Sequence, residues 1–341
     1  MTRILNFADA LKEAMIQELQ RDPTVVVYGE DIVGGTGGKG QKDVRGGTFG
    51  VTKGLFTLFP DRVLDTPITE AAMFGATVGA AVTGLRPVCE IMFIDFYGCG
   101  FDGIMNQAAK FRYMFGGTVK VPLVFRGPYG TGRRLAGQHS QSPYSIFAHL
   151  PGLKVVVPST PYEAKGLLTM AIRDDDPVMF LEHKMMFTDK GEVPEEPYTI
   201  PFKQARIARE GKDVTIVAIG RQVQYAEKAA ETLAAEGIDC EILDPRTLSP
   251  LDEESFFASV GKTGRLVVAD EDTPRCGMAS EFAGLAARFC LSDLKAPVEI
   301  VTEPHSTCPF SYVLEDAFTP SPEMIADAVR RAVGTRRGES A

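Results

Sequence analysis

Three segments of the sequence place polar residues just after a predicted strand. They are residues 29–31 (GED), residues 66–70 (TPITE) and the glycine-rich stretch 126–141 (RGPYGTGRRLAGQHSQ). Open parallel sheets bind their ligands outside the carboxyl ends of the strands. Glu70 and His139 are therefore candidate catalytic residues: one is a carboxylate, and the other is an imidazole that can move protons near neutral pH.

Each candidate also has a purely structural interpretation. Glu70 opens a predicted helix, where an acidic side chain favours the helix dipole by roughly 0.3–1 kcal/mol. Thr66 or Thr69 could serve as the N-cap of that helix. His139 could be a loop histidine that hydrogen-bonds neighbouring main-chain groups. The residues alone leave both interpretations open and do not name a reaction.

Several other kinds of site are missing from the sequence. Residues 34–40 are dense in glycine, but no Gly-Lys-Ser/Thr and no strand–GxGxxG–helix arrangement is present. The sequence also contains no Gly-Asp-Gly, no serine nucleophile elbow and no cluster with metal-ligand spacing. The six cysteines form no CxxC pair, which indicates buried or idle thiols in a reducing compartment.

Hydrophobic periodicity predicts an alternation of strands and helices around these candidates. This alternation is typical of a parallel sheet covered on both faces. Residues 34–50 show no such period and are predicted to form a long loop. The expected strands are 25–28, 62–67, 88–93, 121–125, 153–157 and 178–181, and the expected helices are 7–20, 69–83, 98–115 and 161–173.

A proline- and glutamate-rich stretch ends the first pattern, and a second alternating pattern follows it. We therefore predict the α/β class, with two α/β domains that contain mainly parallel sheets. The predicted domains are residues 1–190 and 206–341, joined by a linker at 191–205. The second pattern comprises strands at 214–219, 240–243, 266–269 and 298–301 and helices at 223–236, 279–289 and 324–333.

Composition is typical of a soluble globular protein. Hydrophobic residues make up 44% of the 341 residues, charged residues make up 24%, and the net charge is -9. This balance argues against a nucleic-acid surface, and no apolar run of about 18 residues predicts a membrane span. The first residues lead straight into a predicted helix rather than a signal peptide. We expect a cytoplasmic protein with neither nucleic acid nor membrane as partner.

Several long motifs, in order from about residue 4 to about residue 335, carry a family resemblance. In these motifs the chain resembles beta subunits of the first component of 2-oxo acid dehydrogenase complexes. The resemblance implies a transketolase-like pyrimidine-binding domain followed by a transketolase C-terminal domain. The motifs are DTPITE (65–70), GLRPVCE (84–90), QHSQ (138–141), PGLKVV (151–156) and DPRTLSPLD (244–252).

The resemblance implies a cofactor, partners and roles for named residues. Thiamine diphosphate would lie between this chain and an alpha subunit in a two-alpha, two-beta heterotetramer. The alpha subunit would hold the diphosphate and Mg²⁺ through a Gly-Asp-Gly motif, which this chain lacks. Glu70 would hydrogen-bond the pyrimidine ring, Phe96 would stack on it and Met92 would lie beside it. His139 would face the reacting carbon and also assist transfer to the lipoyl group of an acyltransferase component.

Some relatives in this family bind a structural monovalent cation, usually potassium. The positions that match its ligands are Leu123, Ala171, Ile172, Asp174 and Asp176, the first three through main-chain carbonyls. The alternative is that residues 174–176 form a surface acidic turn before a proline.

The substrate is harder to predict than the family. Residues 34–55, 107–117 and 262–276 are most similar to acetoin dehydrogenase beta chains, whereas residues 140–168 also resemble pyruvate and branched-chain enzymes. Arg133 and Arg134 could bind a substrate carboxylate or contact the partner chain. Two other classes remain as alternatives: a noncatalytic α/β scaffold for a lipoyl-bearing partner, and a flavin- or nicotinamide-binding electron-transfer subunit.

Overall fold

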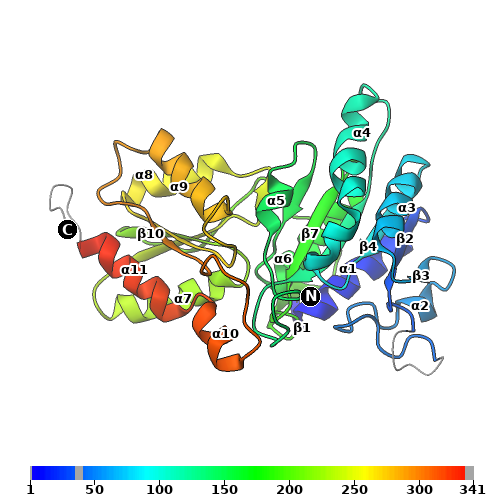
Figure 1. The fold of residues 1–341 in the computed structure, drawn as a ribbon, viewed down its shortest axis with the longest axis horizontal. Coiled ribbons are helices and arrows are strands. Elements are labelled where there is room, and N and C mark those ends of the chain that lie inside the picture. The colour runs from blue at the N-terminus through cyan, green and yellow to red at the C-terminus, as the bar shows by residue number, and fades with distance from the viewer. Residues whose placement is uncertain (1, 35–40, 335–341) are drawn as a thin grey trace. The chain divides into compact units, whose positions relative to one another are not determined.

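The computed structural model describes residues 2–34 and 41–334 (Figure 1). Contacts between residues divide the chain into two compact units. The first runs up to Tyr129 and resumes at Ile146–Phe202, and the second comprises Gly130–Ser145 and the chain from Lys203 onward. The loop that carries His139 therefore packs with the second unit, although the strands that flank it in sequence belong to the first. The sequence-based division at residues 191–205 did not predict that Gly130–Ser145 belongs to the second unit.

The first unit is built on a parallel sheet. Its strands carry runs of apolar and β-branched residues, and β5 and β7 are buried along their whole length. Such runs are typical of strands covered on both faces. The predicted parallel sheet is confirmed. Within this unit the strand order is β6-β7-β5-β4-β2-β3, with bounds β2 (Val25–Glu30), β3 (Val63–Thr66), β4 (Arg86–Glu90), β5 (Val124–Tyr129), β6 (Lys154–Val156) and β7 (Val178–His183).

Two long helices cover one face of this sheet. Their apolar side chains form one core with Val124 and the other inward-facing strand residues. The side chain of Asn6 caps α1 (Phe7–Arg21), and that of Thr160 caps α6 (Pro161–Arg173), whose first residue is a proline. The N-terminus of each of these two helices is therefore specified by residues next to it in the sequence.

Phe125 faces the opposite side of the sheet, where its ring lies 5.1 Å from that of Phe74. The segments on this side are α3 (Glu70–Val82), the 3-10 helix η1 (Ile94–Gly100), the π-helix η2 (Gly103–Ala108) and α4 (Ala109–Met114).

The helix predicted over residues 98–115 is wrong as one continuous α-helix. The chain forms 3-10, π and α turns in succession there. Gly100 and Gly103 pack directly on Phe74: a Cβ at Gly100 would lie 2.3 Å from its ring, and one at Gly103 2.9 Å from its Cβ. Local tightening and widening of the helix lets the main chain follow that neighbour.

The second unit has its own sheet and core. Helices α7 and α11 pack on one face of this sheet and α8 and α9 on the other (Figure 1). The strand order is β14-β13-β10-β11-β9, and β9 is antiparallel to β11. The strands are β9 (Arg206–Arg209), β10 (Val214–Ala218), β11 (Cys240–Asp244), β13 (Leu266–Ala269) and β14 (Glu299–Val301). The helices are α7 (Gln222–Ala234), α8 (Glu253–Thr263), α9 (Met278–Phe289), α10 (Tyr312–Phe318) and α11 (Pro322–Gly334).

Short elements complete the fold. Strand β8 (Lys190–Pro194), which pairs antiparallel with β1 (Thr2–Asn6), occupies the start of the predicted linker. No sequence period indicated either strand, because each is only five residues long. Within the described part of the chain, no helix is long and apolar enough to cross a membrane. The remaining elements are α2 (Leu55–Leu58), α5 (Tyr144–Ala148) and β12 (Thr247–Ser249).

Candidate functional site

The carboxyl ends of three neighbouring strands bring acidic side chains together in the first unit. Glu30 ends β2, Glu90 ends β4, and Thr66 ends β3. The register sets Gly29 beside Glu90 and Glu30 beside Thr66. Because α3 begins four residues after Thr66, Glu70 returns to the same edge of the sheet. The strand-end rule therefore identified a real cluster of chemistry-bearing residues.

Glu70 is the first residue of α3 and is half-buried. Thr69, one of the two predicted residues, occupies the N-cap position, but its side chain makes no capping hydrogen bond. Among the described residues, no group donates a hydrogen bond to the Glu70 carboxylate. A negative charge at a helix N-terminus does favour the helix dipole. Its charge, however, also acts on a neighbouring acid.

That neighbour is Glu30, whose side chain is buried. Burial, together with the charges of Glu70 and Asp31, raises the pKa of Glu30 to about 7. Glu30 Oε1 has no hydrogen-bond partner among the described residues. Among the described residues no cation pairs with either carboxylate, so the charge of Glu70 disfavours ionisation of Glu30. This pair is available to a ligand that donates hydrogen bonds.

Glu90, the third acid at this edge, is fully engaged within the protein. The guanidinium of Arg126 lies between Glu90 and Glu182 and donates to both carboxylates. Burial raises the pKa of Glu182 to about 7, although the charge of Arg126 opposes that rise. Gly47 also packs on Glu90, since a Cβ there would lie 2.7 Å from Glu90 Oε1. The described part of the predicted glycine-rich loop therefore contacts this edge, whereas residues 35–40 lie outside the described residues.

Met92 and Phe96 follow β4 and are both half-buried. The ring of Phe96 meets that of Phe93 edge to face at 6.2 Å. Phe96 belongs to η1, which packs against the start of α3: a Cβ at Gly100 would lie 3.0 Å from the carbonyl oxygen of Glu70. Adjoining segments therefore supply three different groups. These are the partly exposed ring of Phe96, the flexible apolar side chain of Met92, and the Glu70 carboxylate, which has no hydrogen-bond donor among the described residues.

His139 lies in the second unit, in a loop that its own unit holds in place. His139 is half-buried, and its main-chain N–H donates to the carbonyl of Ala136 at 3.3 Å. The guanidinium of Arg134 pairs with Glu315 and Asp316, at 2.8 and 2.7 Å. The open question about Arg134 is thus answered in part, since its partners come from this chain, whereas Arg133 is exposed. No sequence pattern indicated Glu315.

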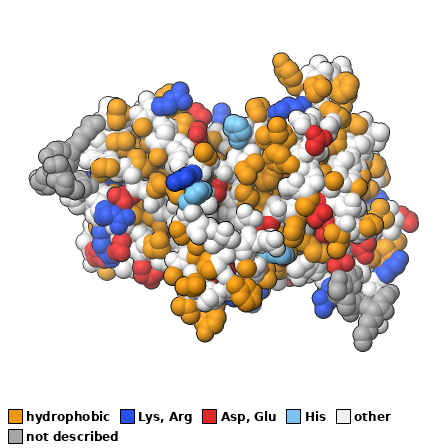
Figure 2. Space-filling view, viewed as in Figure 1, with side chains coloured by type: hydrophobic (Ala, Val, Ile, Leu, Met, Phe, Trp, Pro, Cys, Tyr) orange, Lys and Arg blue, Asp and Glu red, His pale blue; other side chains and the backbone are white. Residues whose placement is uncertain are grey.

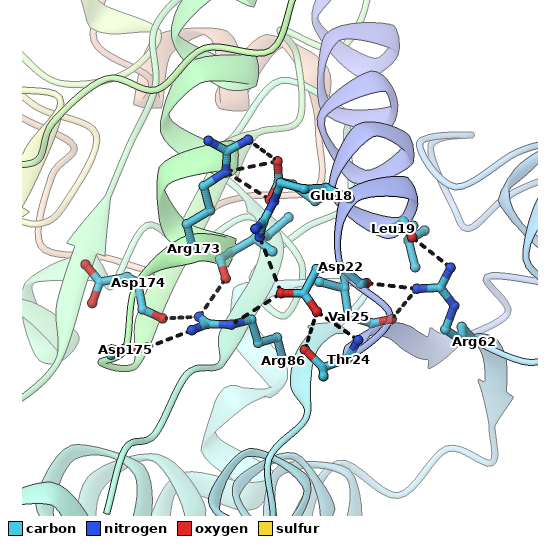
Figure 3. Close-up of polar contacts among 12 residues, drawn as sticks. Glu18, Leu19, Asp22, Thr24, Val25, Arg62, Arg86, Arg173, Asp174 and Asp175 are labelled. Carbon is cyan, nitrogen blue, oxygen red and sulfur yellow. Dashed lines mark hydrogen bonds and ion pairs between the residues drawn. The ribbon is translucent and has the colours of Figure 1, made fainter.

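The predicted cation ligands lie close together, but their carboxylates are already neutralised. Figure 3 shows the guanidinium of Arg86 donating to the main-chain carbonyl of Asp174 and to the carboxylate of Asp175. The same guanidinium also donates to the main-chain carbonyl of Ile172. Lys154 contacts Asp174 at 2.7 Å, and both Lys154 and Arg112 contact Asp176. The carbonyl of Leu123 accepts from Val178. The side chains of Asp174 and Asp176 are thus paired with cations of this chain, and the potassium site stays a prediction.

The described residues also contain no group of three or more His, Cys, Asp or Glu side chains that could hold a metal ion. Of the six cysteines, all described, four are buried, Cys99 and Cys276 are exposed, and none is in a disulfide.

Comparison with known proteins identifies the family. Residues 4–189 match the family described as "Transketolase, pyrimidine binding domain", and residues 203–325 match "Transketolase, C-terminal domain". Over 98% of both chains, the protein is 54% identical to "Acetoin:2,6-dichlorophenolindophenol oxidoreductase subunit beta" of Cupriavidus necator. It is 43% identical, over 95% of its length and 96% of the relative's, to "Pyruvate dehydrogenase E1 component subunit beta" of Rickettsia felis. The chain belongs to the beta subunits of thiamine-diphosphate-dependent first components of dehydrogenase complexes.

The fold of this beta subunit is shared by a solved structure. "Split gene transketolase, inactive beta4 tetramer" matches it with a TM-score of 0.77 at 24% identity, over 98% of this chain and 99% of the other. The family and the transketolase-type fold predicted from the motifs are confirmed. Both relatives are named as beta subunits, which implies that an alpha subunit completes the enzyme.

Proposed function

We propose that this beta subunit, with its alpha subunit and thiamine diphosphate, cleaves acetoin and passes the two-carbon acyl group to lipoamide of an acyltransferase component. One observation carries the choice of substrate. Identity to the relative named for acetoin is 54%, against 43% for the relative named for pyruvate, over nearly the same span of the chain. The structural features of the candidate site support the role of the cofactor.

Thiamine diphosphate supplies a thiazolium carbon that becomes a nucleophile, and the protein supplies orientation and electrostatics. Its pyrimidine ring is flat, has apolar faces, and forms hydrogen bonds at its edge. The half-buried ring of Phe96, the Met92 side chain and the Glu70 carboxylate without a donor fit those three properties. Glu70 would hold a proton at a pyrimidine ring nitrogen, while Phe96 and Met92 would fix the plane of the ring.

His139 would act as the base that acetoin cleavage requires. Acetoin breaks between its two oxygen-bearing carbons, and the hydroxyl proton must leave as acetaldehyde forms. A neutral imidazole can take that proton. Decarboxylation of pyruvate needs no base at the corresponding step, because its carboxylate is already deprotonated and leaves as neutral carbon dioxide. The choice of acetoin and the role of His139 can therefore be tested together.

Exposed apolar surfaces support assembly with partner chains. Figure 2 shows hydrophobic side chains gathered over α10 and over the end of α4. Contiguous exposed apolar residues of this kind typically mark protein interfaces. The exposed face of α3 consists of small residues, and a Cβ at Gly75 or Gly79 would meet nothing within 4 Å. The two apolar groups comprise Tyr113, Met114 and Phe115, and Phe310, Tyr312, Val313 and Leu314.

We assign the diphosphate and Mg²⁺ to the alpha subunit, because this chain has no Gly-Asp-Gly motif. We also propose that the enzyme works in the cytoplasm, since its two exposed and four buried cysteines form no disulfide.

The test is reconstitution with the alpha subunit and Mg²⁺–thiamine diphosphate, followed by dye-reduction assays. We expect kcat/KM for acetoin to exceed that for pyruvate and for 3-methyl-2-oxobutanoate. His139→Ala should slow single-turnover cleavage of acetoin by roughly 100-fold or more, with a smaller effect on any decarboxylation of pyruvate. Gln138→Ala, at the exposed neighbouring position, is the matched control. A preference for pyruvate would overturn the substrate, and equal slowing of both first steps would overturn the role of His139.

A further inference from the structure

The loop that carries His139 has an unusual main-chain path. Gly130 and Gly132 have φ values of +92° and +99°, and the non-glycine residues Arg134 and Ala136 have φ values of +59° and +58°. Left-handed backbone is unfavourable for residues with a side chain, so surrounding contacts must hold it there. Gly137 is equally confined, because a Cβ there would lie 2.2 Å from Cγ2 of Thr307.

One buried carboxylate holds the strained half of this loop. The Glu315 side chain, on α10, is fully buried within the second unit. Its Oε1 accepts from the main-chain N–H of Gly132 at 2.7 Å. Its Oε2 accepts from the main-chain N–H of Arg134 at 3.1 Å and from the Arg134 guanidinium at 2.8 Å. Both oxygens are therefore used to fix two alternate residues of the loop.

Neighbouring contacts orient Glu315 itself. Thr319 donates to the carbonyl of Glu315 and bonds the hydroxyl of Thr131, the first loop residue between the two glycines. Asp316 also pairs with Arg134, but it binds only the guanidinium and is exposed. The two adjacent acids of α10 thus share one arginine, while only Glu315 reaches the main chain of the loop.

We propose that Glu315 is a positioning residue for His139: it holds the loop in the path that presents the imidazole for proton transfer. This inference rests on the proposed role of His139 as a base. The carboxylate is needed because it accepts from both N–H groups. An amide of the same size would turn its NH₂ toward one of these donors, and the loop would relax.

The experiment compares Glu315→Gln with Asp316→Asn in the reconstituted heterotetramer. Each variant removes one negative charge from α10 and one partner from Arg134. We expect Glu315→Gln to lower kcat for acetoin about 10- to 100-fold, because misplacing a base forfeits part of its roughly 10²–10⁴-fold contribution. Hydrogen exchange at the amides of residues 130–145 should also speed up. Asp316→Asn should stay within about twofold of the parent, since its bond to the arginine is solvent-exposed.

A double variant separates positioning from general destabilisation. If Glu315 acts through His139, adding Glu315→Gln to His139→Ala should cost almost nothing further. An equal fold-loss in both backgrounds, or a Glu315→Gln variant with parental kcat, would overturn the proposal. If Glu315→Gln fails to assemble, Glu315→Asp keeps the charge and withdraws it by one methylene, and parental kcat in that variant has the same consequence. A harmless His139→Ala would sink the proposed function, whereas unchanged amide exchange in Glu315→Gln would sink the role of Glu315.

Discussion

Two sets of carboxylates lie near the carboxyl ends of strands of one sheet, and their charges are balanced differently. Glu90 and Glu182 lie on either side of the buried guanidinium of Arg126, which donates to both. Burial alone would lower the pKa of Arg126, but the two carboxylates more than offset it and raise that pKa. Glu30 and Glu70 interact through their charges, and among the described residues no cation pairs with either carboxylate.

This difference separates a structural acid from a functional one. Folding favours arrangements in which every buried charge has a partner. A like-charged pair left without one lowers stability, and such pairs cluster at sites where chemistry or binding uses them. Arg126 shows that the fold can supply a cation at this edge. Glu70 has no ion pair among the described residues, which supports a role in binding a ligand that donates a hydrogen bond.

The largest effect on stability should come from removing Arg126, the cation that pairs with Glu90 and Glu182. Arg126→Met leaves Glu90 and Glu182 buried without their cation, which typically costs about 3–5 kcal/mol of unfolding free energy. Urea denaturation at pH 8, where both acids would otherwise ionise, measures the loss. Arg62→Met is the control, because among the described residues the Arg62 side chain donates to the main-chain carbonyls of Leu19, Asp22 and Val25 and to no carboxylate (Figure 3). An equal loss of unfolding free energy in the two variants would mean that pairing Arg126 with Glu90 and Glu182 does not explain the effect.

Glu70, which lies beside Glu30, should respond in the opposite way: its replacement should lower activity but not stability. Glu70→Gln should lower acetoin turnover of the heterotetramer by at least about 100-fold, since a positioned charge at a cofactor contributes at least that much. Stability should hold or rise, because Glu30 loses a like-charged neighbour. Proton exchange at the thiazolium carbon, followed with cofactor bound, should slow with turnover. Glu253→Gln, which removes an exposed acid from the first turn of α8, is the control. Parental exchange in Glu70→Gln would return Glu70 to the role of a helix-dipole acid.

The residues at the carboxyl ends of the strands could be predicted from the sequence because the signals for strands are local. Buried strands are continuous apolar runs, and the strand-end rule then selected residues 29–31 and 66–70. The helix at 161–173 was predictable to the residue, since Thr160 and Pro161 mark its start. The pairing of Glu30 with Glu70 follows from strand register, which periodicity alone does not reveal.

Interactions between distant residues could not be predicted in this way. Arg134 and Glu315 are 181 residues apart, so no spacing rule connects them. The break in the helix at 98–115 depends on how closely its glycines approach Phe74. The ion pair of Asp174, at the end of α6, depends on Lys154, which lies 20 residues earlier on β6. Each outcome is determined by tertiary packing.

The smallest predicted effect concerns pH and sharpens the comparison within the pair of Glu30 and Glu70. The folded-state pKa of Glu30 is about 7, raised first by burial and then by Glu70 and Asp31, from an ordinary value of 4.5. The folded protein therefore binds a proton more tightly than the unfolded chain. This stabilisation is fully present below about pH 4.5 and is lost as pH rises through about 7.

Glu30→Gln carries no titrating proton and should escape that loss. Relative to the parent, the variant should gain about 1–2 kcal/mol of unfolding free energy between pH 5 and pH 8. Glu182 and Asp272 also have a pKa raised to about 7, but they contribute equally to both proteins and cancel in the difference. The same measurement in a Glu70→Gln background should give a smaller gain, because one cause of the raised pKa is gone. An undiminished gain there would mean that Glu30 responds to burial alone and that the two acids do not form a coupled pair.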